Sequence, residues 1–323
     1  MDRAIGAAAW LARRIGGAVA VWVLISFLAF SLGAFAPGDP AEVMLLRRTG
    51  DPPAEADVER LRHELGLDRP FALRYAAWFS AAVQGDFGRS YRTGRPVIGE
   101  LQARFPATLS LAVAALAVGL VIAIPLAIVS VAARDTVLDH GARLVALVGV
   151  SVPSYWLAYV LMLVFAVQLG LLPVSGAGDI RHLVLSALTL GLGSAATVTR
   201  LLRASLLEEM SSGYVRTARA KGMSRLPVLV RHALRNAVNP VITLSALRFG
   251  RLLGEAAIVE TVFAWPGIGR WMVESIYDRD YPAIQGFVLY IATVFVFLNF
   301  AVDCSYRLLD PRVRVGGPAF GRG

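Results

Sequence analysis

The sequence has few of the residues that most catalytic and metal sites use. It contains one cysteine and four histidines, and a single lysine accompanies its many arginines. One cysteine excludes an intrachain disulfide and a cysteine metal cluster. The histidines are far apart, and no set of His, Cys or Asp has ligand spacing. The G-x-x-x-x-G-K-[ST] phosphate loop is also absent. The sequence therefore predicts no catalytic residue, no metal site and no cofactor on this chain.

Charged residues are scarce as well. They make up 17% of the 323 residues, against 56% hydrophobic residues, and the mean hydropathy is +0.61. This balance is too apolar for an ordinary soluble protein and predicts an all-α, polytopic membrane protein. The net charge of +9 comes from arginines near the ends of apolar runs rather than from basic blocks, which argues against nucleic-acid binding.

Six apolar runs are long enough to cross a lipid bilayer. They cover residues 15–36, 109–133, 144–172, 183–199, 241–263 and 283–302. Pro125 can kink the second run, and Pro153 predicts that the third is tilted or broken. Small residues in the fourth run permit close helix packing, or they line a pathway.

The first run also resembles a secretory signal, because Ala34-Phe35-Ala36 has the form of a cleavage site. It is longer than a signal core of roughly 7–15 residues, so we expect a retained helix. Arginines gather at both ends of the chain and around 208–240, which predicts that both termini are cytoplasmic. We expect three regions: residues 1–36, an external helical subdomain at 37–107 and a core at 108–323. The subdomain should contain helices at 54–65 and 70–83, the second with an apolar edge of Phe71, Tyr75, Trp78 and Phe79.

Residues 208–240 form a basic stretch between the fourth and fifth runs, and their punctuation predicts two short helices. Ser212 and Ser224 are candidate N-caps, because a hydroxyl oxygen can accept from free backbone N–H groups. Gly222 suits the end of the first helix, where a left-handed residue is favoured. Leu226, Leu229, Val230, Ala233 and Leu234 follow helical spacing in the second helix.

The same stretch carries the pattern A-x-A-K-G…H-x-L-R-N…P. It resembles the EAA loop of ABC importer permeases, most closely that of the peptide/nickel family, with Arg216 in the slot where the family has Glu. The matching residues are Ala218, Ala220, Lys221, Gly222, His232, Leu234, Arg235, Asn236 and Pro240. On composition alone, the stretch is equally well read as a solvated loop that obeys the positive-inside rule.

The resemblance implies that the first short helix docks on an ATPase and passes its motion to the membrane helices. ATP and Mg would then bind on two partner ATP-binding subunits. It also implies a second homologous permease subunit, an external solute-binding protein and a place in the bacterial cytoplasmic (inner) membrane.

Other phrases resemble the same family. The 37–107 region contains PGDP, GLDRP and GDFGRSYRTGRPV, and residues 260–267 match E-x-x-F-x-W-P-G. Residues 279–285 match R-D-Y-P-x-x-Q, and 310–312 match a terminal D-P-R. By resemblance, an external gate includes Trp265, Pro266, Gly267, Asp280, Tyr281 and Pro282.

The fifth run carries Arg248, Arg251 and Glu255 at spacings of three and four, so the three share one helix face. Charges in a bilayer are costly, so this face should turn toward protein or water. It is either a polar lining of the translocation path that meets a zwitterionic or chelated solute, or an ion pair of Arg251 with Glu255 or with a neighbouring helix.

The solute stays open between a dipeptide, an oligopeptide, a glutathione-like peptide, nickel and a nickel chelate. The wording FAWPGIGR leans toward nickel permeases, whereas the lack of imidazole and thiolate along the path favours a peptide or a chelated metal. Two alternatives are an ion-gradient-driven secondary transporter and a membrane-anchored scaffold or enzyme that works through 37–107.

Overall fold

The computed structural model describes residues 2–35 and 38–309, so the terminal D-P-R phrase at 310–312 lies outside it. The described residues are helical apart from turns and one isolated bridge, which confirms the predicted all-α class. The chain divides into two compact units, and helix α5 passes from one into the other. The first unit comprises Met1–Arg104 and Trp271–Gly323, and the second is Phe105–Arg270.

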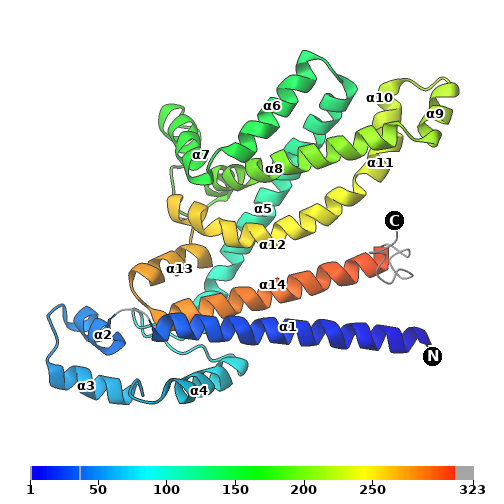
Figure 1. The fold of residues 1–323 in the computed structure, drawn as a ribbon. Helices are drawn as coiled ribbons and strands as arrows, with labels where there is room; N and C mark the ends of the chain where they lie inside the picture. Colours follow the sequence, from blue (N-terminus) through cyan, green and yellow to red (C-terminus); the bar gives the residue numbers. More distant parts are fainter. Residues whose placement is uncertain (1, 36–37, 310–323) are drawn as a thin grey trace. The chain divides into compact units, whose positions relative to one another are not determined.

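Two long helices dominate the first unit. Helices α1 (Asp2–Ala34) and α14 (Tyr281–Leu309) lie side by side (Figure 1). The Trp22 indole N–H donates to Thr293 Oγ1 at 2.9 Å and so joins them. Their exposed side chains within residues 12–34 and 281–301 are mostly apolar, as a lipid-facing surface requires.

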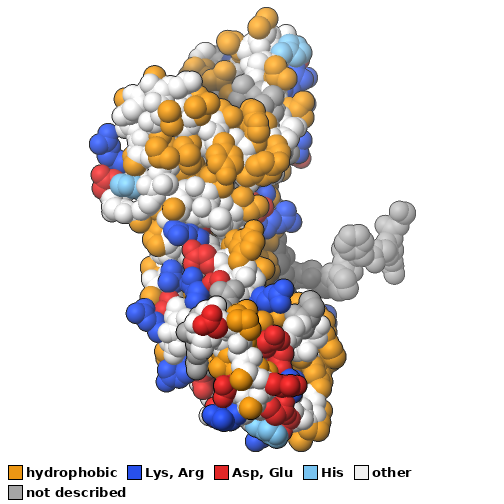
Figure 2. Space-filling model, turned by 90° about the vertical axis from the view of Figure 1, so that its left-hand side faces the viewer, with side chains coloured by type: hydrophobic (Ala, Val, Ile, Leu, Met, Phe, Trp, Pro, Cys, Tyr) orange, Lys and Arg blue, Asp and Glu red, His pale blue; other side chains and the backbone are white. Residues whose placement is uncertain are grey.

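Three short helices lie between α1 and α5: α2 (Pro40–Thr49), α3 (Glu55–Glu64) and α4 (Phe71–Val83). The predicted helices at 54–65 and 70–83 are confirmed as α3 and α4, and α2 is additional. Asp39 begins α2, because its carboxylate accepts from the Ala41 N–H at 2.9 Å and Pro40 needs no partner at the first position. Acidic and basic side chains are intermingled over α2 and α3 (Figure 2).

Helix α4 packs on α1 through aromatic rings. The centroids of Phe30 and Trp78 lie 5.3 Å apart, and those of Phe27 and Tyr75 lie 5.5 Å apart. Such contacts add to the free energy gained by burying the rings. The apolar edge predicted for this helix is therefore the face that packs α4 against α1.

The predicted third span is broken, as Pro153 suggested. The chain forms α6 (Val137–Ser151), stops at Pro153, and continues as α7 (Ser154–Leu161) and the π-helix η1 (Met162–Gln168). Pro153 takes an extended ψ of 136°, which a helix interior cannot contain. Helix α5 (Val97–Ala132) begins well before the predicted residue 109 and contains Pro125 without a break.

The second unit is built on α8 (Ile180–Met210), against which α6, α7 and α12 (Asn239–Val262) pack. A small residue of α8 also lets α5 approach closely, since a Cβ on Gly191 would lie 2.8 Å from the Ala115 carbonyl oxygen on α5. Four short helical segments follow α8, and α13 follows α12. They are α9 (Gly213–Ala220), α10 (Arg225–Val228), the π-helix η2 (Leu229–Ala233), α11 (Leu234–Ala237) and α13 (Ile268–Tyr277).

Four described helices are long and apolar enough to cross a membrane: α1, α5, α8 and α14. Helix α12 is 24 residues long but carries Arg248, Arg251 and Glu255 near its centre. The broken α6–α7 segment divides the remaining predicted span. A multi-pass membrane fold is therefore supported, and the count of six spans stays a prediction.

Candidate functional sites

The predicted loop after α8 forms a bent segment, Gly213–Ala237, which we call the elbow. Its first helix, α9, ends in a Schellman motif: the Met223 N–H donates to the Ala218 carbonyl and the Gly222 N–H to the Arg219 carbonyl, at 3.3 and 2.9 Å. Gly222 has a φ of +88°, which favours glycine. The family residues Ala218 and Gly222 are thus the two ends of one turn, as predicted for Gly222.

Hydrogen bonds tie the elbow to the long helices. The Tyr214 hydroxyl donates to Glu209 at the end of α8, and Asn236 Nδ2 on α11 donates to the Tyr214 oxygen at 3.3 Å. The Arg225 guanidinium donates to the Val131 carbonyl at the end of α5 at 3.1 Å. The motif residue Asn236 therefore holds α9, and Arg225 fixes the second half of the elbow on α5.

The outer surface of the elbow is cationic. Ala220, Lys221 and Gly222 are exposed, as is Arg235, while His232 is half-buried. Arg216, in the slot where the family has Glu, donates to the Ser211 carbonyl at 3.4 Å. The segment therefore offers an exposed, positively charged helix end whose backbone position is fixed.

Two expectations for the elbow are wrong in detail. Ser212 and Ser224 occupy the N-cap positions, but neither side chain makes a capping hydrogen bond. The second helix winds into a π-turn at η2, which rotates its apolar face. Leu229 and Ala233 are buried there, whereas Leu226 and Val230 are about half exposed. A π-turn has no sequence signal that distinguishes it from an α-helix.

A buried carboxylate near the elbow was missed by sequence reasoning. Asp139 at the start of α6 is fully buried and accepts from Arg203 on α8 at 3.0 and 3.2 Å. Ser130 of α5 donates to it at 2.5 Å, and Arg143 pairs with it at 3.2 Å. We call this cluster the inner brace, because it joins α5, α6 and α8 where the elbow is attached.

The turn after α12 is organised by a second buried carboxylate, that of Glu260. Glu260 accepts from the Thr108 hydroxyl at 2.5 Å and from the Arg270 N–H at 2.9 Å. A Cβ on Gly267 would overlap the Glu260 carboxyl group, so the position requires glycine. The Trp265 indole donates to the Ala107 carbonyl at 2.9 Å. The phrase E-x-x-F-x-W-P-G is thus one folded turn, with Pro266 between its two fixed residues.

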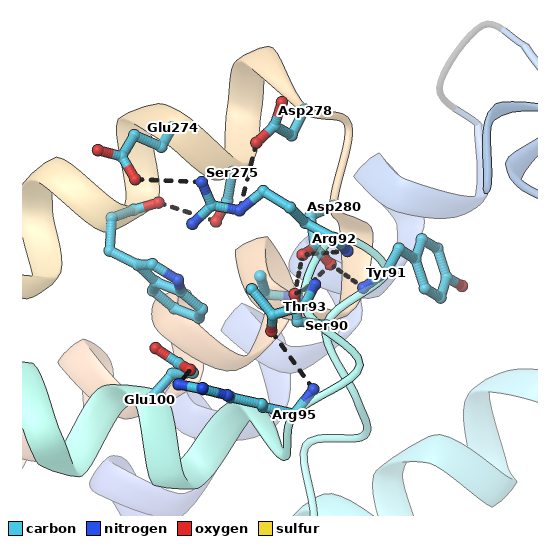
Figure 3. A network of polar contacts seen from close by, with 12 residues as sticks. Ser90, Tyr91, Arg92, Thr93, Arg95, Glu100, Glu274, Ser275, Asp278 and Asp280 are labelled. Atoms are coloured by element: carbon cyan, nitrogen blue, oxygen red, sulfur yellow. Dashed lines mark hydrogen bonds and ion pairs between the residues drawn. The ribbon is translucent and has the colours of Figure 1, made fainter. Parts of the chain in front are cut away.

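In the first unit, Asp280 organises the loop at residues 90–93 (Figure 3). Its buried carboxylate accepts from the Ser90 hydroxyl at 2.5 Å and from the Tyr91 N–H at 2.9 Å. Arg92 reaches Glu274 and Asp278 at 3.3 and 3.4 Å. Burial, and after it the Asp280 charge, raises the pKa of Tyr91 to about 12. Tyr281 and Pro282 of the predicted gate follow Asp280 directly at the start of α14.

Within the described residues of this chain, the polar face of α12 forms no ion pair. Arg251 and Glu255 are both exposed, and no ion pair joins them in the described chain. The Arg248 guanidinium donates through Nη2 to the Gly193 carbonyl and to Thr197 Oγ1 on α8, at 3.2 and 3.4 Å. Its Nε is buried without a partner. Among the described residues no group of three His, Cys, Asp or Glu side chains is placed to hold a metal ion.

Comparison with known families decides what these sites belong to. Residues 119–315 match the family described as binding-protein-dependent transport system inner membrane component. Residues 8–112 match the N-terminal family of the same transport systems. The chain belongs to this permease family.

Curated relatives resemble the permease over almost its whole length. The di/tripeptide transport system permease protein DppB of Pseudomonas aeruginosa is 37% identical over 94% of this chain and 98% of its own. The glutathione transport system permease protein GsiC of Escherichia coli K12 is 39% identical, with coverage of 94% and 98%. The probable D,D-dipeptide permease DdpB of the same strain is 38% identical, with coverage of 95% and 98%.

Solved structures share the fold at low identity. The inward-facing MetNI methionine ABC transporter matches with a TM-score of 0.55 and 20% identity, over 65% of this chain and 96% of its own. An amino acid ABC transporter crystallised with histidines gives 0.52 and 17%, over 65% and 94%. These likenesses show a shared fold.

Proposed function

We propose that this permease is one transmembrane subunit of an ATP-driven importer that moves di- or oligopeptides inward. The observation that carries the proposal is the elbow. Its exposed cationic helix α9 has a fixed end and is hydrogen-bonded to α8 and to α11, and its second half is hydrogen-bonded to α5 through Arg225. In a segment held in this way, a displacement of α9 is transmitted directly to the long helices. Both termini and the elbow lie on the cytoplasmic side, following the distribution of arginine.

The energy source lies on other chains. Two ATP-binding subunits hydrolyse ATP with Mg and receive α9 in a groove whose charge complements Lys221 and its neighbouring arginines. A second, homologous permease completes the pathway. An external binding protein delivers the solute. By resemblance, Trp265 in the turn after α12 is an outer-gate residue, and so are Asp280 and Tyr281 at the start of α14.

Peptides are the preferred solute class. Several relatives carry the names of dipeptide, tripeptide or glutathione permeases. The polar face of α12 carries two arginines and a glutamate (Arg248, Arg251 and Glu255), which suit charged organic groups better than a bare nickel ion. An ion-gradient transporter and a membrane-anchored enzyme are not favoured, because the whole chain matches permeases of binding-protein-dependent systems.

Competition uptake tests the proposal. The importer is assembled with its partner subunits in liposomes. Uptake of radiolabelled dialanine is measured with ATP supplied on the side of the membrane that carries the ATP-binding subunits. Unlabelled di- and tripeptides should compete, whereas nickel chloride and nickel–histidine should not. Uptake that proceeds without ATP, or competition by nickel compounds alone, would contradict the proposed solute and energy source.

A further inference from the structure

The polar face of α12 lies in the middle of a helix that we predict to cross the membrane as the fifth span. Arg248, Arg251 and Glu255 sit near the centre of Asn239–Val262. A charge at this depth is costly unless water, protein or a ligand faces it, by estimates from roughly 2.5 kcal/mol upward. These side chains therefore need partners that a single chain does not supply.

Arg248 is held in place without being neutralised. One end of its guanidinium donates to the Gly193 carbonyl and the Thr197 hydroxyl on α8. No carboxylate pairs with it in the described chain, and its buried Nε has no hydrogen-bond partner. The buried hydroxyls of Ser194 and Ser245 in the same two helices also lack partners. Unmet polar groups of this kind are costly, so the α8–α12 contact favours an arrangement in which water or a ligand reaches them.

Arg251 and Glu255 are one helical turn apart and carry opposite charges, yet they do not pair and both are exposed. An unpaired cation and an unpaired anion on one face fit a ligand that carries both charges. With a rise of 1.5 Å per residue, the Cα atoms of 251 and 255 are separated by about 6 Å along the axis, and those of 248 and 255 by about 10.5 Å.

A short peptide with free ends has charges at these separations. An extended chain advances roughly 3.3–3.6 Å per residue, so the termini of a dipeptide lie about 7 Å apart and those of a tripeptide about 10 Å. A guanidinium binds a carboxylate with two parallel hydrogen bonds, and a carboxylate accepts from an ammonium group.

We propose that the Arg248/Arg251/Glu255 face binds the zwitterionic backbone of a di- or tripeptide during its passage. Arg251 or Arg248 takes the terminal carboxylate, and Glu255 takes the terminal ammonium. The inference rests on the proposed peptide function. Ion pairing of the same side chains with the second permease subunit is the competing explanation.

The test combines permease variants with peptides that lack one charge. Uptake of dialanine, N-acetyl-dialanine and dialanine amide is measured in the reconstituted importer for wild type, Glu255→Gln, Arg251→Gln and Arg248→Gln. The ratio of variant to wild-type uptake is compared between peptides. Any preference of the external binding protein is common to the wild-type and variant importers and cancels in this ratio.

Glu255→Gln should lower dialanine uptake about tenfold and leave uptake of the N-acetyl peptide unchanged. Arg251→Gln or Arg248→Gln should lower dialanine uptake about tenfold and leave uptake of dialanine amide unchanged. Arg200→Gln, an exposed arginine on α8, is the matched control and should affect all three peptides equally.

Equal losses for all three peptides in every face variant would overturn the inference and indicate pairing with the partner permease. A wild-type importer that takes up no peptide at all would instead refute the proposed function. If Arg248→Gln fails to assemble, as judged by co-purification, the exposed Arg251 and Glu255 still decide the question.

Discussion

Removing the charge of Asp139 should release the inner brace. In Asp139→Asn the carboxylate that accepts from Arg203 and Ser130 and pairs with Arg143 is lost, and two arginines are left facing a neutral amide. Breaking a buried pair by removing one partner costs roughly 3–5 kcal/mol. Because the Arg203 and Arg143 side chains keep 20% and 44% exposure, we expect the lower end, about 3 kcal/mol.

Thermal unfolding of the assembled importer in detergent measures this loss. With about 2 °C per kcal/mol for a chain of this size, the midpoint should fall by about 6 °C. The matched control is Arg134→Gln, which removes an exposed pair with Asp135 and should shift the midpoint by about 1 °C or less. A midpoint for Asp139→Asn within 1 °C of wild type would refute the role of the brace.

The difference in stability between wild type and Asp139→Asn depends on pH with a defined sign. Burial alone would raise the pKa of Asp139, but hydrogen bonds from Arg203 and Ser130 outweigh it and hold the pKa well below its usual value of 3.8. A lowered folded-state pKa gives stability that is present above the unfolded pKa and is lost as the pH falls through the folded one. The gap between wild type and Asp139→Asn should therefore stay constant from pH 8 to 5; a gap that closes within this range contradicts the assignment.

Three further predictions follow from single contacts. Gly222 has a φ of +88°, so Gly222→Val should strain the α9 turn by about 1–2 kcal/mol. This variant should lower the amount of peptide transported per ATP hydrolysed, whereas Gly213→Ala should not. An unchanged ratio of peptide to ATP would count against the role of the elbow. In Gly267→Ala the added methyl group should displace the Glu260 carboxyl group and destabilise the assembly by about 1–3 kcal/mol. Gly254 has open space around it, so Gly254→Ala should not. Equal thermal unfolding midpoints for the two variants would contradict the packing described here. Asp280→Asn should free the loop at residues 90–93, seen as faster trypsin cleavage at Arg92; wild-type cleavage rates would show that other contacts hold it.

Local chemistry made much of the fold predictable. The left-handed turn at Gly222, the break at Pro153 and the aromatic face of α4 each depend on one residue type or one periodic pattern, and these were predicted. Helix α2 was missed although Asp39, Pro40 and Gly50 carry its start and stop signals, because the run between them is short and only weakly apolar.

The buried carboxylates were beyond prediction for a different reason. Asp139 meets Arg203 across 64 residues of chain, and Glu260 meets Thr108 across 152. No local pattern reports such pairings, since a carboxylate near a helix end looks the same in the sequence whether it is solvated or buried. The same holds for Arg248, whose spacing to Arg251 and Glu255 placed it on a face but did not reveal its bonds to α8.

The central claim is that the permease is moved by partner ATPases through the elbow. Its most direct test is cross-linking of Arg219→Cys on α9 to the ATP-binding subunit, combined with dialanine uptake in liposomes. We predict that a cross-link forms and that uptake requires ATP. Uptake driven by an ion gradient in the absence of any ATP-binding subunit would contradict the account.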